Sequence, residues 1–242
     1  MLEGPESVGS SEPMRVAVLA SGGGSNLQAL LDRFHSPPGA GARVELVIGS
    51  RPGLAALARA EAAGVANVVV DPRPLDVDSH SAALLEQLDT HRIELVILAG
   101  YLHLVPARVV ERFHGRMLNI HPALLPAFGG LGLYGVHVHR AVIESGARVS
   151  GATVHLVDEQ FDTGRILAQW PVPVLHSDTP AALAARVLRV EHQLLPAVVE
   201  AFASGRDAPP LLEPIAFELV AVPGPSGDSV RRLIAPPPTP SL

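Results

Sequence analysis

Arg15-Val-Ala-Val-Leu-Ala20 is a short apolar run that leads directly into the glycine-rich stretch Ser21-Gly-Gly-Gly-Ser25-Asn26. The run does not alternate between polar and apolar residues, so it predicts a strand covered on both faces, as strands of parallel sheets are. Apolar side chains then recur with helical spacing from residue 25 to residue 34. A buried strand, a glycine-rich turn and a helix in this order begin a right-handed βαβ unit. This stretch therefore predicts an α/β fold.

The same alternation continues along the first half of the chain. Further apolar runs predict buried strands at 43–49, 68–70, 94–99 and 117–120. The segments between them predict helices at 53–63, 79–91 and 106–113. Helices between consecutive strands imply parallel crossovers. We therefore predict an open, doubly wound, mostly parallel sheet.

The alternation of strands and helices changes after residue 130, where a turn-rich loop precedes a predicted helix at 136–145. Strands are predicted at 148–158 and 166–174, and the connection between them is too short for a parallel crossover. The sheet is therefore expected to end in an antiparallel edge.

A long helix is predicted from residue 179 to residue 204. Asp178 or Thr179 is expected to be its N-cap, and Gly205 is expected to end it. The chain thus divides into a disordered lead at 1–13, one folded domain at 14–205 and a proline-rich tail. The tail, residues 206–242, is expected to hold one strand at 216–222 and a loose end.

Composition narrows the class of protein. The 242 residues are 48% hydrophobic, enough for one large α/β domain. The net charge is −6 without a basic block, so no nucleic-acid partner is expected. Apolar runs are too short to span a bilayer, and the lead lacks the pattern of a signal peptide, so no membrane partner is expected. The chain has no cysteine, which excludes disulfides and thiol catalysis and suits the cytoplasm, the predicted location.

Ligands of doubly wound sheets bind at the carboxyl ends of the parallel strands. Three segments are expected there: the loop 21–26 after the first strand, the loop 100–105 after the fourth and residues 119–121 after the fifth. The loop 21–26 is the first candidate. Its glycines let the backbone approach a ligand closely, and the following helix N-terminus offers free N–H groups to an anion. A phosphate on a small substrate is the natural ligand. The alternative is a tight turn with Ser25 or Asn26 as helix cap.

The second candidate is Asn119-Ile-His121-Pro122, at the end of the fifth predicted strand. Alternation along a strand places Asn119 and His121 on one face. A carboxamide and a protonated imidazole side by side suit an oxyanion. The alternative is that both side chains are structural.

Two further polar residues follow. Asp162 lies between two predicted strands, and a carboxylate near His121 would raise the pKa of that histidine and hold it charged. The alternative is that Asp-Thr-Gly is only a turn. His155 is a supporting candidate, and its alternative is the exposed face of an edge strand. His137 and His139 are placed in a helix, where they diverge, and no metal site is expected.

Several segments occur in the order found in one family: Gly24-Ser25-Asn26, Leu98-Ala-Gly-Tyr101, Leu118-Asn-Ile-His121-Pro-Ala-Leu-Leu-Pro126, Gly151-Ala-Thr-Val-His155 and Asp162-Thr-Gly164. From about Met14 to Gly205 the chain closely resembles the phosphoribosylglycinamide formyltransferases, folate-dependent enzymes of purine synthesis. The resemblance implies the formyltransferase fold. It also implies formyl transfer from 10-formyltetrahydrofolate, as co-substrate and without a metal, to the amine of 5'-phosphoribosylglycinamide.

The resemblance also implies residue roles. Asn119, His121 and Asp162 would be catalytic. The ribonucleotide would be bound by Gly24, Ser25, Asn26, Leu188, Arg189, Val190 and Glu191. The folate would be bound by Asn119, by His80, Leu102, His103, Leu104 and Val105, and by Asp158, Glu159, Gln160, Phe161 and Asp162. His80 and His103 depart from the family, which often has arginine at both positions.

Proteins with other functions can carry some of the same motifs. A formyltetrahydrofolate hydrolase usually has a regulatory domain ahead of this one, and residues 1–13 are too few to supply it. A methionyl-tRNA formyltransferase needs a sizeable basic C-terminal domain, which the acidic, proline-rich tail does not resemble. A phosphate-binding module without catalysis would keep the loop 21–26 but need not bring Asn119, His121 and Asp162 together. The expected partners are small molecules, and the chain is expected to be a monomer or a homodimer.

Overall fold

A seven-stranded sheet forms the centre of the computed structural model, which describes residues 12–35, 41–205, 218–223 and 229–234. The strands of this sheet are β1 (Met14–Ala20), β2 (Ala42–Gly49), β3 (Ala66–Val69), β4 (Leu95–Leu98), β5 (Met117–His121), β6 (Val149–Leu156) and β7 (Ile166–Pro173). The helices of the described residues are α1 (Ser25–Phe34), α2 (Ala55–Ala62), α3 (Val77–Thr90), α4 (Ala107–Arg112), α5 (Val136–Glu144) and α6 (Pro180–Ser204).

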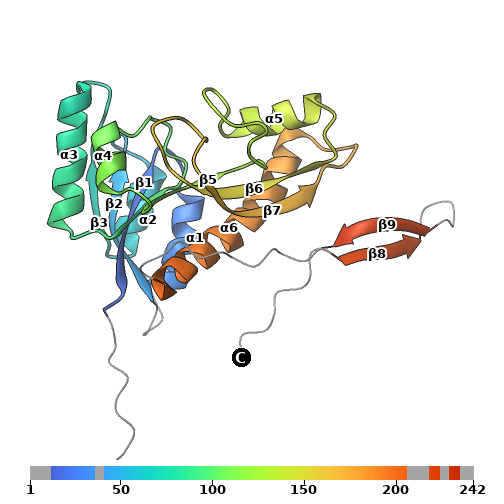
Figure 1. The fold of residues 1–242 in the computed structure, drawn as a ribbon, viewed down its shortest axis with the longest axis horizontal. Helices are drawn as coiled ribbons and strands as arrows, with labels where there is room; N and C mark the ends of the chain where they lie inside the picture. Colours follow the sequence, from blue (N-terminus) through green and yellow to red (C-terminus); the bar gives the residue numbers. More distant parts are fainter. Residues whose placement is uncertain (1–11, 36–40, 206–217, 224–228, 235–242) are drawn as a thin grey trace, which may run out of the picture.

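The strand order is β3-β2-β1-β4-β5-β6-β7 (Figure 1). The five strands from β3 to β5 pair in parallel, and β6 and β7 pair antiparallel. This confirms the predicted fold class, an open doubly wound sheet with an antiparallel edge. The chain winds outward from β1 to β3 and then returns to place β4 on the other side of β1. The sheet therefore has a switch point between β1 and β4, where ligands of such folds bind.

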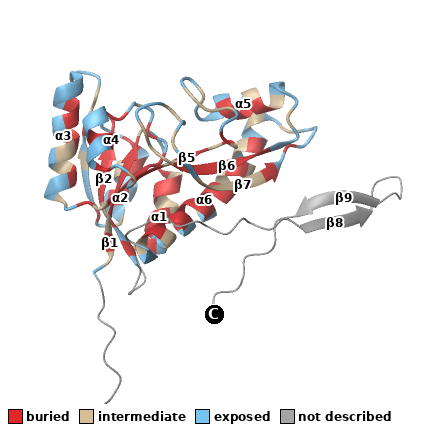
Figure 2. Ribbon diagram, viewed as in Figure 1, coloured by how far each residue is buried: buried red, intermediate tan, exposed pale blue. Residues whose placement is uncertain are grey.

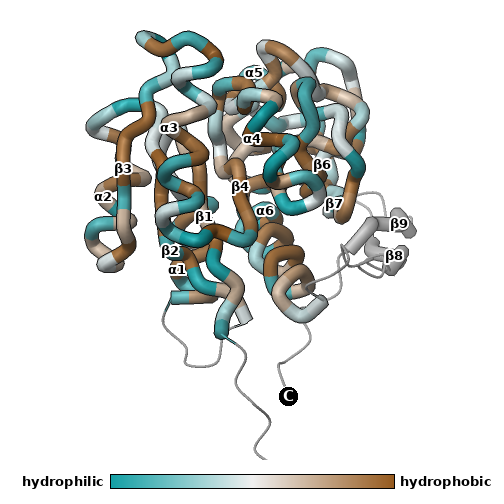
Figure 3. Tube along the Cα trace, turned by 60° about the vertical axis from the view of Figure 1, so that its left-hand side comes forward, coloured by the Kyte–Doolittle hydropathy of each residue, from teal (hydrophilic) through white to brown (hydrophobic). Residues whose placement is uncertain are grey.

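Helices cover both faces of the sheet (Figure 1). One apolar cluster includes side chains of α1, α2, α5 and α6, and the other includes side chains of α3 and α4. Along β1, Val16 and Val18 belong to the first cluster and Ala17 and Leu19 to the second. Both faces of the central strands are thus buried (Figure 2), which explains their uninterrupted hydrophobic sequence (Figure 3).

Three local predictions need correction or choice. The strand at 68–70 was expected to be covered on both faces, but β3 is the sheet edge and Val69 is 39% exposed. Helix α3 starts before residue 79 because the Asp76 side chain accepts from the Ser79 amide at 2.7 Å and caps the helix earlier. Of the two caps predicted for α6, Thr179 is the observed one, accepting from the Ala182 amide at 3.2 Å.

The predicted tail strand corresponds to β8 (Glu218–Pro223), which pairs antiparallel with β9 (Ser229–Ile234) in a separate two-stranded sheet. β9 was not predicted. Most of the lead predicted to be disordered, 1–11, and the loose end, 235–242, lie outside the described residues.

Candidate active site

A cavity of about 710 Å³ opens at the carboxyl ends of β1, β4 and β5, beside the switch point. Its walls include residues 22–26, 98–105, 119–122 and 130–136, together with parts of the β6–β7 loop and of α6. The loops after β1 and β4 are tied together, since Leu102 donates its amide to the Ser21 hydroxyl at 3.1 Å. The three segments that the sequence placed at this edge therefore meet in one cavity, of a size suited to a small ligand.

Gly24 shapes the wall formed by the glycine-rich loop. It is the N-cap of α1 with φ 73°, and no side chain caps this helix. A Cβ at Gly24 would lie 2.8 Å from the Ala56 Cα, so a larger residue would push α2 away. The alternative in which Ser25 or Asn26 caps α1 is wrong. Both residues instead line the cavity, beside the unpaired N–H groups of the first turn.

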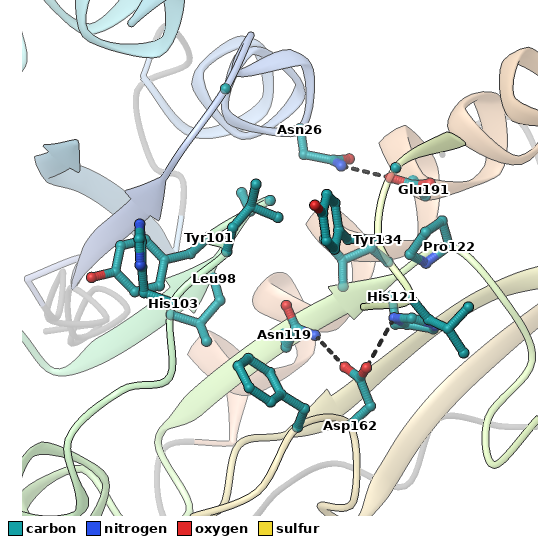
Figure 4. Close-up of a pocket in the computed structure, with 18 of the residues that line it drawn as sticks. Asn26, Leu98, Tyr101, His103, Asn119, His121, Pro122, Tyr134, Asp162 and Glu191 are labelled. Carbon is teal, nitrogen blue, oxygen red and sulfur yellow. Dashed lines mark hydrogen bonds and ion pairs between the residues drawn. The ribbon is translucent and has the colours of Figure 1, made fainter. Parts of the chain in front are cut away.

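Helix α6 closes one side of the cavity. Asn26 donates its Nδ2 to the Glu191 carboxylate at 2.6 Å (Figure 4), and Glu191 is buried. Burial raises the pKa of Glu191 and outweighs the opposing effect of the Asn26 hydrogen bond. Leu188 and Glu191 line the cavity, whereas Arg189 is exposed and Val190 packs in the core. Helical periodicity separates these neighbours onto different faces.

Asn119, His121, His155 and Asp162 form one polar cluster, with Asp162 at its centre. Figure 4 shows Asn119 and His121 both turned toward Asp162. Asn119 donates Nδ2 to Asp162 Oδ1 at 3.2 Å, and His121 Nδ1 lies 3.5 Å from Asp162 Oδ2. His155 Nε2 is 3.0 Å from Asn119 Nδ2 and 3.5 Å from Asp162 Oδ1. His155 is therefore not on an exposed edge: β6 is an interior strand, and this side chain is 2% exposed.

Backbone carbonyls orient both rings of this cluster. The Phe128 carbonyl is 2.8 Å from His121 Nε2, and the Leu156 carbonyl is 2.8 Å from His155 Nδ1. A carbonyl only accepts, so each of these nitrogens carries a hydrogen. His121 Nδ1 is then the nitrogen that titrates, and it faces Asp162. With the hydrogen of His155 on Nδ1, Nε2 can accept from Asn119.

The charge state of His121 differs from the prediction. Burial lowers the pKa of His121, while Asp162 and the Phe128 carbonyl raise it by a smaller amount and His155 lowers it further. The net result is a pKa below the ordinary value of 6.5. Asp162 therefore acts in the predicted direction, but it does not hold His121 charged in the ligand-free protein, because the ring is 3% exposed and loses its hydration.

Asp162 adopts a conformation that most residues avoid, with φ 59°. Its Oδ2 accepts from the Gly130 amide at 2.8 Å. Burial raises the pKa of Asp162, but the His155 ring, the neighbouring His121 ring and the Gly130 amide together bring it below its ordinary value. Asp162 is thus held as a carboxylate in a strained backbone conformation, a combination that is frequent at functional sites.

Most of the remaining predicted site residues also line the cavity. Leu102, His103, Leu104 and Val105 line it, together with Asp158, Gln160, Phe161 and Asp162. Glu159 is absent from this lining, and so is His80, which is buried with Nε2 3.3 Å from the Tyr101 hydroxyl. Burial lowers the pKa of His80, with a smaller contribution from His103.

The loop 130–136 and His139 were not assigned to the site from sequence, yet both line the cavity. The loop brings the Gly130 amide to Asp162, and Tyr134 projects into the cavity (Figure 4). Its glycines signalled a turn, but no local pattern indicated which residues the turn would meet. His139 and His137 diverge on α5 as predicted: His139 is buried and His137 is exposed.

Within the part of the chain that the structure describes, no group of three or more His, Asp or Glu side chains is arranged to hold a metal ion. No helix there is long and apolar enough to cross a membrane.

The fold and the site define a class of protein. The sequence profile of the formyl transferase family matches residues 14–199, and the chain belongs to this family. Within it, the chain is similar to phosphoribosylglycinamide formyltransferases. The chloroplastic enzyme of Arabidopsis thaliana is 44% identical over 214 residues, which cover 84% of this chain and 73% of the relative. The chloroplastic enzyme of Vigna unguiculata is 45% identical over 207 residues, covering 82% of this chain and 65% of the relative.

A solved structure agrees with these sequence relatives. The crystal structure of phosphoribosylglycinamide formyltransferase from Brucella melitensis superposes with a TM-score of 0.73 at 42% identity. The match covers 80% of this chain and 97% of the Brucella chain.

Proposed function

We propose that the protein is a phosphoribosylglycinamide formyltransferase, an enzyme of purine biosynthesis. It transfers a formyl group from 10-formyltetrahydrofolate to the amine of 5'-phosphoribosylglycinamide. The observation that carries this proposal is one cavity that joins a glycine-rich anion cradle, at Gly24 to Asn26, to the buried cluster around Asp162. The first feature suits a phosphate, and the second suits acyl-transfer chemistry.

The two substrates fit opposite halves of the cavity. The phosphate of the ribonucleotide would bind to backbone N–H groups of the loop 22–26, at the start of α1. Glu191, on the neighbouring wall, would accept hydrogen bonds from the ribose hydroxyls. The apolar wall at 102–105 and Phe161 would contact the folate ring system. The two substrates would then meet at Asn119 and His121.

In the proposed reaction the substrate amine attacks the formyl carbon, so a carbon–nitrogen bond forms and the carbonyl oxygen becomes negative. Asn119 and His121 stabilise this oxyanion. Asn119 would give up its longer hydrogen bond, the one to Asp162 at 3.2 Å, to donate to it. The oxyanion adds a negative charge beside His121, which raises the pKa that burial has lowered. His121 therefore takes up a proton from solvent as the oxyanion forms and returns it when the intermediate collapses.

The intermediate then collapses. The bond from the formyl carbon to the folate nitrogen breaks, the carbonyl re-forms, and the leaving nitrogen takes the proton that the amine loses. A water bound to Asp162 would relay this proton. The proposed reaction uses no metal and forms no covalent intermediate with the enzyme. The loss of a single oxyanion donor should reduce turnover by about 10²–10³-fold.

The discriminating experiment mixes the protein with formyl-folate in the presence and absence of the ribonucleotide and follows deformylation of the folate by absorbance. Ribonucleotide-dependent deformylation supports the transferase. Deformylation without the ribonucleotide would instead show a formyltetrahydrofolate hydrolase, and none at all would indicate a binding module.

The variants His121→Ala and Asp162→Ala test the site assignment. Both should lose most turnover while keeping the circular dichroism spectrum and melting temperature of a folded protein. The matched control is His114→Ala, because His114 is exposed and outside the cavity. Near-normal turnover of Asp162→Ala would contradict the catalytic role proposed for this carboxylate.

We further propose that residues 14–205 are the catalytic domain, because the described cavity and both apolar clusters are built from them. A chain ending at residue 205 should then keep turnover and melting temperature. The cytoplasmic location, and a monomeric or homodimeric state, stay predictions. Cell fractionation tests the location, and light scattering of the purified protein tests the oligomeric state.

A further inference from the structure

We propose that Arg59, a surface residue of α2 outside the cavity, is a positioning residue that sets the affinity of the glycine-rich loop for the substrate phosphate. The inference rests on the proposed function, because it takes this loop to be the phosphate site. It adds a residue that contacts neither substrate and was not a candidate from sequence.

The cavity poses an electrostatic problem for such a substrate. A phosphate monoester carries about −1.5 to −2 charges at neutral pH. Among the described residues, no arginine or lysine lines the cavity, and the nearby Glu191 and Asp162 are acidic. Binding must therefore depend largely on neutral donors, chiefly backbone N–H groups, and the direction in which these groups point affects the affinity.

Arg59 contacts the opposite side of the loop. Its Nε donates to the Gly23 carbonyl at 2.9 Å, and one terminal nitrogen donates to the Gln28 side chain of α1 at 2.9 Å. Close by, the Ala56 amide donates to the Gly22 carbonyl at 3.3 Å. The carbonyls of Gly22 and Gly23 are thus both turned toward α2.

This arrangement fixes the amides as well. In a trans peptide the C=O and the following N–H point in opposite directions. Holding the Gly22 and Gly23 carbonyls on α2 therefore turns the N–H groups of Gly23 and Gly24 away from α2. They join the first-turn N–H groups of α1 on the cavity side. Without Arg59 the Gly22–Gly23 segment has little steric constraint, since glycine adopts many conformations and nothing lies within 4 Å of a Cβ at either residue.

The guanidinium also acts through the peptide itself. A charged donor on the Gly23 carbonyl polarises that peptide and strengthens the N–H of Gly24 as a donor. Arg59 thus replaces the direct arginine–phosphate contact that the cavity lacks, and it does so without entering the cavity.

A purely structural role makes different predictions. Arg59 is exposed, so its removal leaves no buried charge. If Arg59 only held α1 and α2 together, its removal would lower the melting temperature and weaken the binding of both substrates equally. A positioning role affects only the binding of the phosphate group.

The variants that test this role are Arg59→Ala, Arg59→Gln and Arg59→Lys, with Arg33→Ala as the control. Arg33 is an exposed arginine of α1 that pairs with Glu200, away from the glycine-rich loop.

The readouts are the KM for each substrate, kcat, the melting temperature, and calorimetric binding of ribose 5-phosphate and of ribose. Arg59→Ala should raise the KM for the ribonucleotide and the Kd for ribose 5-phosphate by about tenfold, the loss of one charge-assisted hydrogen bond. Binding of ribose, the KM for formyl-folate and kcat should change less than twofold. Arg59→Lys keeps one donor and should recover part of the affinity, whereas Arg59→Gln should not.

An unchanged affinity for ribose 5-phosphate in Arg59→Ala would overturn the inference. Equal losses for ribose 5-phosphate and formyl-folate would also overturn it, in favour of a structural staple. The binding assay needs no turnover, so it separates this inference from the proposed function. A wild-type protein that binds ribose 5-phosphate through Arg59 but transfers no formyl group would refute the function and keep the inference.

Discussion

His121 lies between two protein groups that both favour its charged form. The Phe128 carbonyl fixes the hydrogen on Nε2, and the Asp162 carboxylate faces Nδ1. The carboxylate favours a charged ring, but burial disfavours it more, so the pKa of His121 lies below its ordinary value. A ring that is neutral when the site is free and becomes charged as an oxyanion forms is well suited to acyl transfer, because it responds to charge that develops during the reaction.

This balance predicts a titration. Followed by NMR of its ring protons, His121 should titrate below 6.5 in the ligand-free protein. Asp162→Asn removes a group that raises this pKa, so the midpoint should move to still lower pH. A midpoint above 6.5, or one that Asp162→Asn leaves in place, would contradict the assigned balance. His121→Gln identifies the resonance.

At the scale of the element, the β6–β7 loop decides whether Asp162 reaches the cluster. Gly164 ends this loop so close to β6 that a Cβ there would overlap the Leu156 carbonyl oxygen. Gly164→Ala should therefore displace the loop, carry Asp162 away from His121 and lower turnover by about 10²-fold, comparable to the loss of one catalytic contact.

The control is Gly115→Ala. Gly115 has a positive φ, 70°, unlike Gly164, and nothing lies within 4 Å of its Cβ position. It is far from the site, between α4 and β5. This variant should lose about 1–2 kcal/mol of unfolding free energy and keep its turnover. Equal turnover in the two glycine variants would argue against the role given to the loop.

Helix α6 offers a second test at this scale. The Thr179 hydroxyl caps its first turn. Thr179→Ala should lower the free energy of unfolding by about 1 kcal/mol, as measured by urea denaturation, because the Ala182 amide loses its acceptor. Thr179→Ser retains the oxygen and should be nearly neutral. Since α6 carries Glu191 in its middle, away from the cap, KM for the ribonucleotide should not change.

At the scale of the whole molecule, buried histidines make stability depend on pH. Burial lowers the pKa of four histidines: His80, His121, His139 and His192. For His139 it falls to about 4 from the ordinary value of 6.5. Between these two values the unfolded chain binds more protons than the folded one. This contribution to stability is complete above 6.5 and is lost as the pH falls toward 4.

The unfolding free energy, measured in urea from about pH 7 to about pH 4.5, should therefore decrease steadily. Glu191 opposes this trend: its raised pKa stabilises the folded state at low pH and loses that effect as the pH rises. His139→Gln should flatten the dependence. A free energy independent of pH across this window would refute the assignment of these histidines as neutral buried groups.

The sequence by itself determined the sheet, the order of its elements and the face on which the key side chains lie. Hydrophobic runs, glycines and strand alternation are local signals, because the repeat of two along a strand is set by the backbone. They placed Asn119 beside His121 and the loop 21–26 at the ligand edge, and the family resemblance added Glu191 and the loop 158–162.

Tertiary structure alone decided what these residues experience. The pKa of His121 depends on desolvation by segments distant in sequence, His155 is buried because β6 is interior, and the loop 130–136 reaches Asp162 through a backbone amide. Arg59 lies 36 residues along the sequence from Gly23, to whose carbonyl it donates a hydrogen bond. Burial and long-range hydrogen bonds are properties of the packed chain, and no local pattern carries them.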